Sequence, residues 1–335
     1  MPRRSSVGPV RTVEPVTDTS PATPDASPLP YVSGPALRAA LSPTGAVDAL
    51  ERTLADGLDP ESDAPRTRVE TSSGTLLQMP STRGHDVGTK LLTLTPGNAA
   101  EGLPVIQGVY VLFGGSAQAP RAVLDGIELT NLRTSAVSAL GARLAGATTP
   151  DAHLVLFGTG VQAWEHAVTF CEVLDVGRIT VVGRSGERAE ALAARIAEEL
   201  DVPAQAGDAD AVTQADVVVC CTACAVPLFE GARVKDDAVV VAMGAHTPDA
   251  RELDDALLSR AQVIVESRDS ALREAGEVVL CMESGAVAKP ELVTFADLAT
   301  GRVRRQAGVP AAVVTTGMPW QDLVVASAVM DALGG

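Results

Sequence analysis

A glycine-rich turn between an apolar run and a helical pattern constrains this chain more than any other feature. Residues 158–163 read Gly-Thr-Gly-Val-Gln-Ala, follow the apolar run 153–157 and open a stretch with a helical apolar face. Glycines permit a tight turn and a close approach of the backbone to a ligand, while free amides at a helix start favour an anion. This order of strand, turn and helix predicts a dinucleotide-binding fold, with the pyrophosphate at the turn.

The sequence after the turn alternates apolar runs with helical patterns. The runs are 153–157, 179–182, 216–221, 238–243 and 262–266. They lack a period of two, which is typical of strands covered on both faces in a doubly wound parallel sheet. The predicted fold class is therefore α/β, with ligands at the carboxyl ends of the strands.

The sequence before the turn predicts a smaller domain. Short apolar runs separated by Pro and Gly between 66 and 130 indicate a small sheet, and Ser42 and Pro43 are typical of a helix start. A helical pattern from 130 to 146 is expected to join the two domains, and the apolar pattern 321–333 is expected to return to the first. Residues 1–30 are rich in Pro, Ser and Thr and are expected to form a disordered tail.

Charge and composition exclude several function classes. The formal charge of −16 disfavours a nucleic-acid partner, and no apolar run is long enough to cross a membrane. Five cysteines give no disulfide framework, which favours a cytoplasmic location. Cys221 and Cys224 form a single C-x-x-C without further ligands, so structural cysteines are favoured and no metal site is predicted.

The end of the second predicted strand indicates the cofactor. This strand is followed by Gly183, Arg184 and Ser185 rather than by the carboxylate that binds the ribose 2′-hydroxyl of NAD. An arginine there would pair with a 2′-phosphate through charge-assisted hydrogen bonds. The residues therefore predict NADPH in preference to NADH, and Thr222, at the end of another strand, is expected to contact it.

A basic island lies well before the glycine turn. Between residues 66 and 90 there are four bases and two acids, in a chain of net charge −16. The bases are Arg66, Arg68, Arg83 and Lys90. A positive patch in an acidic protein indicates a small anionic ligand.

Short motifs along the chain resemble those of the ornithine cyclodeaminase/mu-crystallin family. In order they are Pro65-Arg66-Thr67, Gln78-Met79-Pro80, Gly88-Thr89-Lys90, Gly102-Leu103-Pro104, Leu124-Asp125-Gly126, Leu129-Thr130-Asn131-Leu132-Arg133-Thr134, Gly158-Thr159-Gly160-Val161-Gln162 and Arg251-Glu252-Leu253-Asp254. The resemblance covers most of the chain from residue 35 onward. It implies a Rossmann domain, 134–304, joined to a smaller α+β domain for substrate binding and dimerisation, made of 31–133 and 305–335.

The resemblance also implies a site. Arg66 and Arg133 look like the family's carboxylate-gripping arginines, and Lys90 looks like its active-site lysine, which holds the substrate or supplies a proton. Thr134 is expected to contact a cofactor phosphate. The full set expected to bind the cofactor is Arg133, Thr134, Gly158, Thr159, Gly160, Val161, Gln162, Arg184, Ser185, Thr222, Met243 and Gly244.

Two departures from the family pattern bear on the reaction. In cyclodeaminases of the family, the loop that corresponds to the one after strand 238–243 resembles Gly-Gly-Asp. This chain has Gly-Ala-His at 244–246. The carboxylate base of the cyclodeaminases is therefore missing, which favours an imine reductase. His246 either shuttles a proton or only bonds the nicotinamide or its own loop. Trp320 stands where the family usually has a small residue, and it is expected to narrow or cover the mouth of the active site.

The residues and the resemblance together predict an NAD(P)H-dependent reductase. Its substrate is the C=N bond of a small α-imino acid, cyclic or linear, and its catalytic residues are Lys90 and His246. Three alternatives stay open: an ornithine or lysine cyclodeaminase, an amine-condensing amino-acid dehydrogenase, and a non-catalytic cofactor-binding protein like the crystallin member. The resemblance also implies a homodimer.

Overall fold

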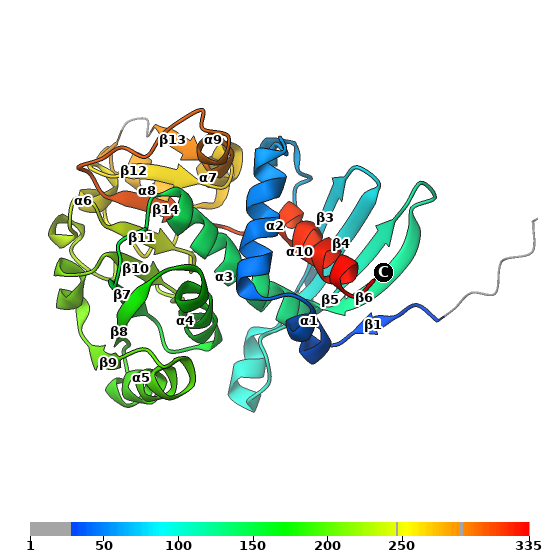
Figure 1. Ribbon diagram of the computed structural model, residues 1–335, viewed down its shortest axis with the longest axis horizontal. Coiled ribbons are helices and arrows are strands. Elements are labelled where there is room, and N and C mark those ends of the chain that lie inside the picture. Colours follow the sequence, from blue (N-terminus) through cyan, green and yellow to red (C-terminus); the bar gives the residue numbers. More distant parts are fainter. Residues whose placement is uncertain (1–27, 246, 288–290, 335) are drawn as a thin grey trace, which may run out of the picture.

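The computed structural model describes residues 28–245, 247–287 and 291–334, which form two lobes (Figure 1). The predicted tail 1–30 lies outside the described residues except for its last three positions. One lobe holds an eight-stranded sheet and the other a six-stranded sheet, and helices α2 (Pro43–Ala55) and α3 (Gly126–Leu144) lie between the two sheets. None of the described helices is long and apolar enough to cross a membrane.

The larger sheet is parallel throughout, in the order β13-β12-β14-β11-β10-β7-β8-β9. Its strands are β7 (Ala152–Phe157), β8 (Val176–Val182), β9 (Ala204–Gly207), β10 (Val217–Cys220), β11 (Val239–Ala242), β12 (Gln262–Val265), β13 (Leu292–Thr294) and β14 (Ala311–Val314). The chain runs outward from β7 to β9 and then returns past β7 to β10, so the strand order reverses between β7 and β10. This topology confirms the predicted doubly wound sheet, and the reversal places a ligand crevice at the carboxyl ends of these two strands.

Alternate side chains of β7 pack into two separate cores. Leu154 and Leu156 join the core that contains α3, α4 (Val161–Val173), α5 (Gly186–Leu200) and α9 (Phe295–Ala299). Val155 and Phe157 join the core on the other face, which contains α6 (Asp255–Leu258), α7 (Arg268–Glu274) and α8 (Gly276–Glu283). Burial on both faces explains why the apolar runs lack a period of two.

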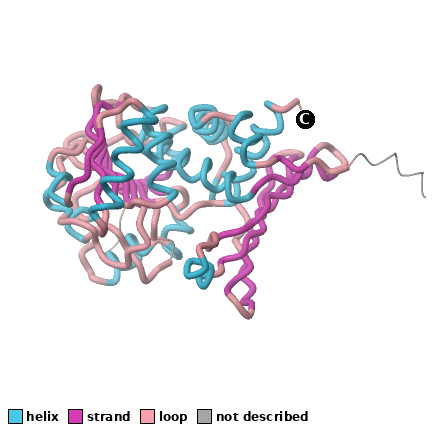
Figure 2. The backbone as a smooth tube through the Cα atoms, turned by 90° about the horizontal axis from the view of Figure 1, so that it is seen from below, coloured by secondary structure: helices cyan, strands magenta, loops and turns pink. Residues whose placement is uncertain are grey.

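The smaller sheet has the order β1-β6-β5-β4-β3-β2 and is antiparallel except for the β1–β6 pair. Its strands are β1 (Tyr31–Val32), β2 (Thr67–Thr71), β3 (Gly74–Arg83), β4 (Asp86–Leu94), β5 (Ile106–Gly114) and β6 (Ala119–Asp125). The C-terminal helix α10 (Pro319–Ala332) packs against β3, β4 and α2, and α1 (Gly34–Ala40) lies beside β6. Figure 2 shows helices on one side of this sheet only.

Four short 3₁₀ segments complete the described elements. They are η1 (Pro60–Ser62), η2 (Pro96–Glu101), η3 (Ala209–Thr213) and η4 (Gly231–Arg233). The first of them, η1, leads into the loop that carries Arg66.

The predicted domain boundary at residue 305 needs correction. β14 lies between β11 and β12 in the larger sheet, although the boundary gave residues 305–335 to the smaller domain. The strands β14, β9 and β13 were not predicted from the sequence. Tertiary pairing, which the local sequence does not encode, decides these strands.

Helix α3 begins earlier than its pattern predicted. Asp125 caps it, because Asp125 Oδ1 accepts hydrogen bonds from the amides of Ile127 and Glu128 at 2.9 and 3.0 Å. A Cβ on the first helical residue, Gly126, would lie 2.6 Å from the backbone of Gly108 in β5. The glycine therefore lets the helix start directly against the smaller sheet.

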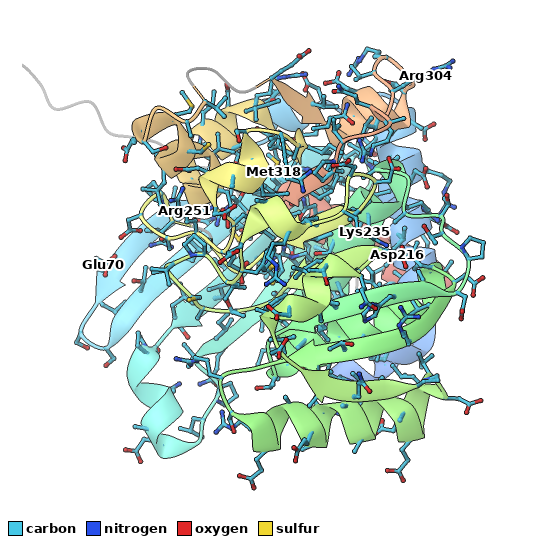
Figure 3. All side chains as sticks on the ribbon, turned by 90° about the vertical axis from the view of Figure 1, so that its left-hand side faces the viewer. Glu70, Asp216, Lys235, Arg251, Arg304 and Met318 are labelled. Carbon is cyan, nitrogen blue, oxygen red and sulfur yellow. The ribbon has the colours of Figure 1, made fainter. Side chains whose placement is uncertain are left out.

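An acidic residue aligns β10 with β7. Asp216 Oδ2 accepts a hydrogen bond from the amide of His153 at 2.8 Å, and Oδ1 pairs with Lys235 Nζ at 2.6 Å. Figure 3 shows Asp216 and Lys235 beside each other on this lobe. These contacts fix the register of β10 against β7, and this register determines how the carboxyl ends of the two strands lie at the crevice.

Candidate active site

The turn after β7 has the geometry that a pyrophosphate needs. Gly158 has a φ of +121°, and a Cβ there would lie 2.6 Å from the carbonyl oxygen of Cys221. A Cβ on Gly160, in contrast, would meet nothing within 4 Å. Gly160 immediately precedes α4, whose first amides have no partner within the helix. The first glycine permits close packing, and the second leaves open space before a helix start, where an anion is stabilised.

A cleft of about 610 Å³ opens beside this turn. The predicted cofactor residues that line it are Gly158, Thr159, Gly160, Arg184, Ser185 and Thr222. Arg188, which the sequence analysis did not identify, lines it as well. Arg184 and Arg188 are both exposed, and within the described part of the chain neither guanidinium makes a hydrogen bond or an ion pair. Two cations are therefore available at the tip of β8.

A second cavity, of about 370 Å³, lies where the two lobes meet. Arg66, Lys90 and Arg133 line it, so the structure brings together the three cations predicted to bind the substrate. The other predicted cofactor residues that line this cavity instead of the cleft are Thr134, Gln162, Met243 and Gly244. Val161 lines neither space.

The cleft and the cavity border the same segment of the chain. Cys221, Thr222 and Ala223, which follow β10, line both of them. A dinucleotide whose pyrophosphate lies at the glycine turn can therefore extend one end across Thr222 into the cavity. That end would face the three cations.

Lys90 lies on β4 and is the most deeply buried of the cations, at 1% exposed. Its Nζ is 2.9 Å from Oδ1 and 2.8 Å from Oδ2 of Asp322. Burial and, to a lesser extent, the charge of Arg133 lower the pKa of Lys90 to about 8, while Asp322 opposes this shift. A lysine that titrates near neutral pH can both hold and release a proton.

Arg133 lies on α3, with its side chain against the start of α10. Its Nε is 3.3 Å from Asp322 Oδ1, and one of its terminal nitrogens donates to Gln321 Oε1 at 3.4 Å. Gly317 has a φ of +75°, and a Cβ there would lie 2.6 Å from the guanidinium of Arg133. These contacts use only part of the five donors of the guanidinium, so the rest remain available to a carboxylate.

Arg66 lies in the loop between η1 and β2. It donates to the carbonyl oxygen of Gly317 at 2.7 Å and pairs with Glu274 Oε2, at the end of α7, at 3.1 Å. Burial lowers the pKa of Arg66, yet a guanidinium stays protonated in a protein. Arg66 therefore brings a fixed positive charge from the smaller lobe to the wall of the cavity.

Three buried polar residues hold these cations, and the sequence analysis assigned a role to none of them. They are Glu266, Gln321 and Asp322, each at most 2% exposed. Glu266 Oε1 accepts from Gln321 Nε2 at 2.5 Å, and its Oε2 accepts from the amide of Gly317 at 3.0 Å. Gln321 and Asp322 are two polar residues at the start of an otherwise apolar helical pattern. Polar residues are rarely buried without a partner, so this pattern is the sequence signal for a buried polar contact.

Trp320 does not cover the active-site cavity, contrary to the expectation from its size. It is 1% exposed, its amide donates to Asp63 Oδ2 at 2.7 Å, and it lines a separate cavity of about 150 Å³. Because each helical residue turns the chain by about 100°, Trp320 and Asp322 project to nearly opposite sides of α10. Trp320 therefore packs behind the site and not over its mouth.

The predicted catalytic His246 lies outside the described residues, so its role stays a prediction. No group of His, Cys, Asp and Glu in the described ranges could hold a metal ion. Burial raises the pKa of Cys220 and of Cys221 well above the ordinary thiol value. These thiols are therefore poor nucleophiles, as expected for structural cysteines.

The glycine turn, the cleft beside it and the neighbouring cavity of cations, together with reductases among the relatives, define the class of this protein as a Rossmann-fold oxidoreductase with a nicotinamide cofactor. The chain belongs to the ornithine cyclodeaminase/mu-crystallin family, whose model matches residues 43–335.

Known relatives agree with this assignment. Ketimine reductase mu-crystallin from Mus musculus is 35% identical over 243 residues, which are 72% of this chain and 75% of the relative. Delta(1)-pyrroline-2-carboxylate reductase 1 from Burkholderia multivorans is 34% identical over 290 residues, which are 85% of this chain and 89% of the relative.

A solved structure shares the fold. Delta(1)-pyrroline-2-carboxylate reductase from Thermococcus litoralis, in complex with NADH and L-proline, superposes with a TM-score of 0.82 at 22% identity, over 91% of this chain and 97% of that one.

Proposed function

We propose that this protein reduces the C=N bond of a small α-imino acid, cyclic or linear, with NADPH as hydride donor. The observation that carries the proposal is that Cys221, Thr222 and Ala223 line both the cleft beside the glycine turn and the cavity with the three cations. A nicotinamide at this junction would face Arg66, Lys90 and Arg133, which are the groups that an anionic, imine-bearing substrate needs. The reductase names of the curated relatives support the same reaction.

The two arginines fix the substrate. A planar guanidinium pairs with both oxygens of a carboxylate, so Arg133 and Arg66 orient the α-carbon next to the carboxylate. The cavity is also lined by Leu77, Met79 and Leu92 from β3 and β4, on the same sheet face as Lys90. This apolar surface suits the methylene groups of a ring or short chain and displaces water from the reacting carbon.

Lys90 supplies the proton. When bound, the nicotinamide provides the hydride that the imine carbon accepts, and the nitrogen must gain a proton at the same stage. The ammonium of Lys90 donates that proton, and Asp322 keeps Lys90 oriented and favours its charged form. Solvent then returns a proton to Lys90 before the next turnover.

The experiment that tests the function follows NADPH oxidation with pyrroline-2-carboxylate, piperideine-2-carboxylate and linear imino acids, and measures ammonia in parallel. Oxidation of one NADPH for each imine consumed is the expected result. Ammonia release from ornithine or lysine without net cofactor turnover would instead identify a cyclodeaminase. Oxidation only when an amine and a keto acid are both present would identify a condensing dehydrogenase, and cofactor binding without any turnover would identify a binding protein.

The preference for NADPH is proposed to depend on Arg184. Arg184→Ala should raise the Kd for NADPH roughly 10- to 100-fold, because charge-assisted hydrogen bonds to the 2′-phosphate are lost. The Kd for NADH should change little, since NADH has a hydroxyl at this position. Titration of protein fluorescence with both cofactors measures the effect.

A matched control lies on α5. Arg195→Ala removes an exposed arginine that pairs with Glu199 at 2.8 Å and does not line the cleft. It should leave both Kd values unchanged. An equal loss of affinity for NADPH and NADH in Arg184→Ala would contradict the 2′-phosphate assignment.

The pKa of Lys90 predicts opposite pH dependences for the two directions of the reaction. Imine reduction needs the protonated lysine, so kcat/KM should fall as the pH rises through about 8. Oxidation of the amine needs the neutral lysine, so its kcat/KM should rise through the same range. Steady-state pH profiles in both directions measure this, and Lys90→Arg should lose the titration because a guanidinium stays protonated. The same pH-dependent limb in Lys90→Arg would show that a group other than Lys90 titrates.

The homodimer is proposed to form through the uncovered face of the smaller sheet. Lys90 and Leu92 point to the buried face, so Leu91 and its cross-strand partner Val109 point to the other one. Val111 and Val123 pair on that same uncovered face. An apolar sheet face of this kind is typical of a subunit interface. Light scattering should give a mass twice that of one chain.

A further inference from the structure

Glu252 is a buried carboxylate that the reaction above does not use. It is 0% exposed and lines neither the cleft nor the cavity, so it touches neither substrate nor cofactor. Its Oε1 accepts hydrogen bonds from the amide of Thr222 at 2.8 Å and from the hydroxyl of Thr222 at 2.7 Å. Its Oε2 accepts from the amide of Gly244 at 2.8 Å. One side chain thus ties together the segments that follow β10 and β11.

The two tied segments are in close contact and both line the cavity. A Cβ on Gly244 would lie 1.9 Å from the carbonyl oxygen of Thr222, so only glycine allows this approach. Thr222 lines the cleft as well as the cavity, and it therefore lies at the junction where the nicotinamide must pass. Glu252 controls the one hydroxyl side chain at that junction.

The hydrogen bonds of Thr222 leave one position open. A threonine hydroxyl has one proton to donate and two lone pairs that can accept. The proton goes to Glu252, which is an acceptor for backbone amides on both of its oxygens. One lone pair accepts from the amide of Cys224 at 3.2 Å. The remaining lone pair can only accept, so the Thr222 hydroxyl is unable to donate to a ligand.

We propose that Glu252 is a positioning residue that fixes the Thr222 hydroxyl as an acceptor for the carboxamide N–H of the nicotinamide. The inference rests on the proposed function for the presence of a nicotinamide and adds how its ring is oriented. The carboxamide is the only N–H donor on the nicotinamide ring. A bond from it to Thr222 fixes which face of the ring turns toward Lys90 and Arg133.

The burial of Glu252 is stabilised by its own set of donors. Burial raises the pKa of Glu252, and the hydrogen bonds from Thr222 and Gly244 oppose that rise. The amide of Glu252 donates to Glu277 Oε1 at 3.0 Å, which holds the backbone at this position. Glu277 Oε2 has no hydrogen-bond partner in the described part of the structure. Glu277 therefore offers a matched control: a second buried carboxyl in the same cluster that does not contact Thr222.

The test compares two cofactors that differ only in this donor. The acetylpyridine analogue of NADP⁺ has a methyl ketone in place of the carboxamide, so it keeps the carbonyl and lacks the N–H. Isothermal titration gives the Kd of each cofactor for the wild type and for Thr222→Val, Thr222→Ser, Glu252→Gln and Glu277→Gln. No turnover is required.

The wild type should bind NADP⁺ roughly three- to tenfold more tightly than the analogue, as one hydrogen bond predicts. Thr222→Val and Glu252→Gln should bring this ratio close to one. In Glu252→Gln, an NH₂ group in the place of Oε1 removes the acceptor for the Thr222 hydroxyl proton, which frees the hydroxyl to donate elsewhere. Thr222→Ser keeps the hydroxyl and should keep the ratio, and Glu277→Gln keeps an acceptor for the Glu252 amide and should also keep it.

Three results would overturn the inference. A wild-type ratio of one means that Thr222 does not accept from the carboxamide. A ratio that persists in Glu252→Gln, with equal weakening of both cofactors, means that Glu252 only supports the fold. A ratio that persists in Thr222→Val assigns the carboxamide to another residue and remains decisive even if Glu252→Gln does not fold. Failure of the wild type to bind either cofactor would instead refute the proposed function itself.

Discussion

Arg133→Ala should lower kcat/KM for imine reduction by about two to four decades, which corresponds to roughly 3–6 kcal/mol of transition-state stabilisation. The change removes two charge-assisted hydrogen bonds to the substrate carboxylate in a site that is only 8% exposed at this side chain. Lys90 keeps its own pair with Asp322, so the proton donor should survive. Initial rates of NADPH oxidation over a range of imine concentrations measure the loss.

The lysine substitution and a second arginine on the same helix serve as controls. Arg133→Lys keeps the charge but not the planar pair of donors, so it should recover only part of the activity. Arg143→Ala removes an arginine of α3 that pairs with Asp48 and Glu51 and does not line the cavity. It should leave kcat/KM unchanged. Full activity in Arg133→Ala would contradict the role of this arginine in holding the carboxylate.

Asp322→Ala should destabilise the fold by about 3–5 kcal/mol, because it leaves two buried cations without their shared counter-ion. Asp322 is 0% exposed and contacts both Lys90 and Arg133. Chemical denaturation followed by circular dichroism measures the change. Asp331→Ala, in the same helix but with a side chain that is 73% exposed, should have little effect.

Asp322→Asn should also move the pH profile, and the direction follows from the charge. Asp322 raises the pKa of Lys90, so its neutralisation should lower that pKa further below about 8. The protonated lysine is then lost at a lower pH, and kcat/KM for reduction should begin to fall at a lower pH than in the wild type. A fold as stable as the wild type together with an unchanged profile would show that Asp322 does not control Lys90.

The fold was predictable where several neighbouring residues share one pattern, as in the glycine turn and the apolar runs. The glycine turn identifies a dinucleotide cleft, because Gly158 adopts a positive φ that glycine takes most easily and Gly160 leaves open space before the start of α4. The long buried runs identify the parallel sheet. The strand β14 was missed and the boundary at 305 misplaced, because its position between β11 and β12 depends on tertiary pairing.

The cations of the site were predictable from motifs, but their partners were not. Arg66, Lys90 and Arg133 are far apart in the sequence, and the structure brings all three to one cavity. Asp322 was missed because the direction of a side chain on a buried helix depends on how that helix packs. For the same reason the size of Trp320 suggested a lid, although the residue packs behind the site.

The position of Arg188 in the sequence indicates a functional role. It lies in the first turn of α5, where a cation opposes the helix dipole and needs another reason for its presence. Its place on the cleft beside Arg184 supplies that reason.

In the proposed complex, the substrate carboxylate is held by Arg66 and Arg133 and faces the nicotinamide where the cleft and the cavity meet. A crystal structure of the complex with NADP⁺ and a cyclic amino acid such as L-proline tests this arrangement most directly. We expect the carboxylate to pair with both arginines, the ring nitrogen to lie near Lys90, and the α-carbon to lie opposite the nicotinamide beside Thr222. A carboxylate bound away from the arginines, or protein atoms between the nicotinamide and Lys90, would contradict it.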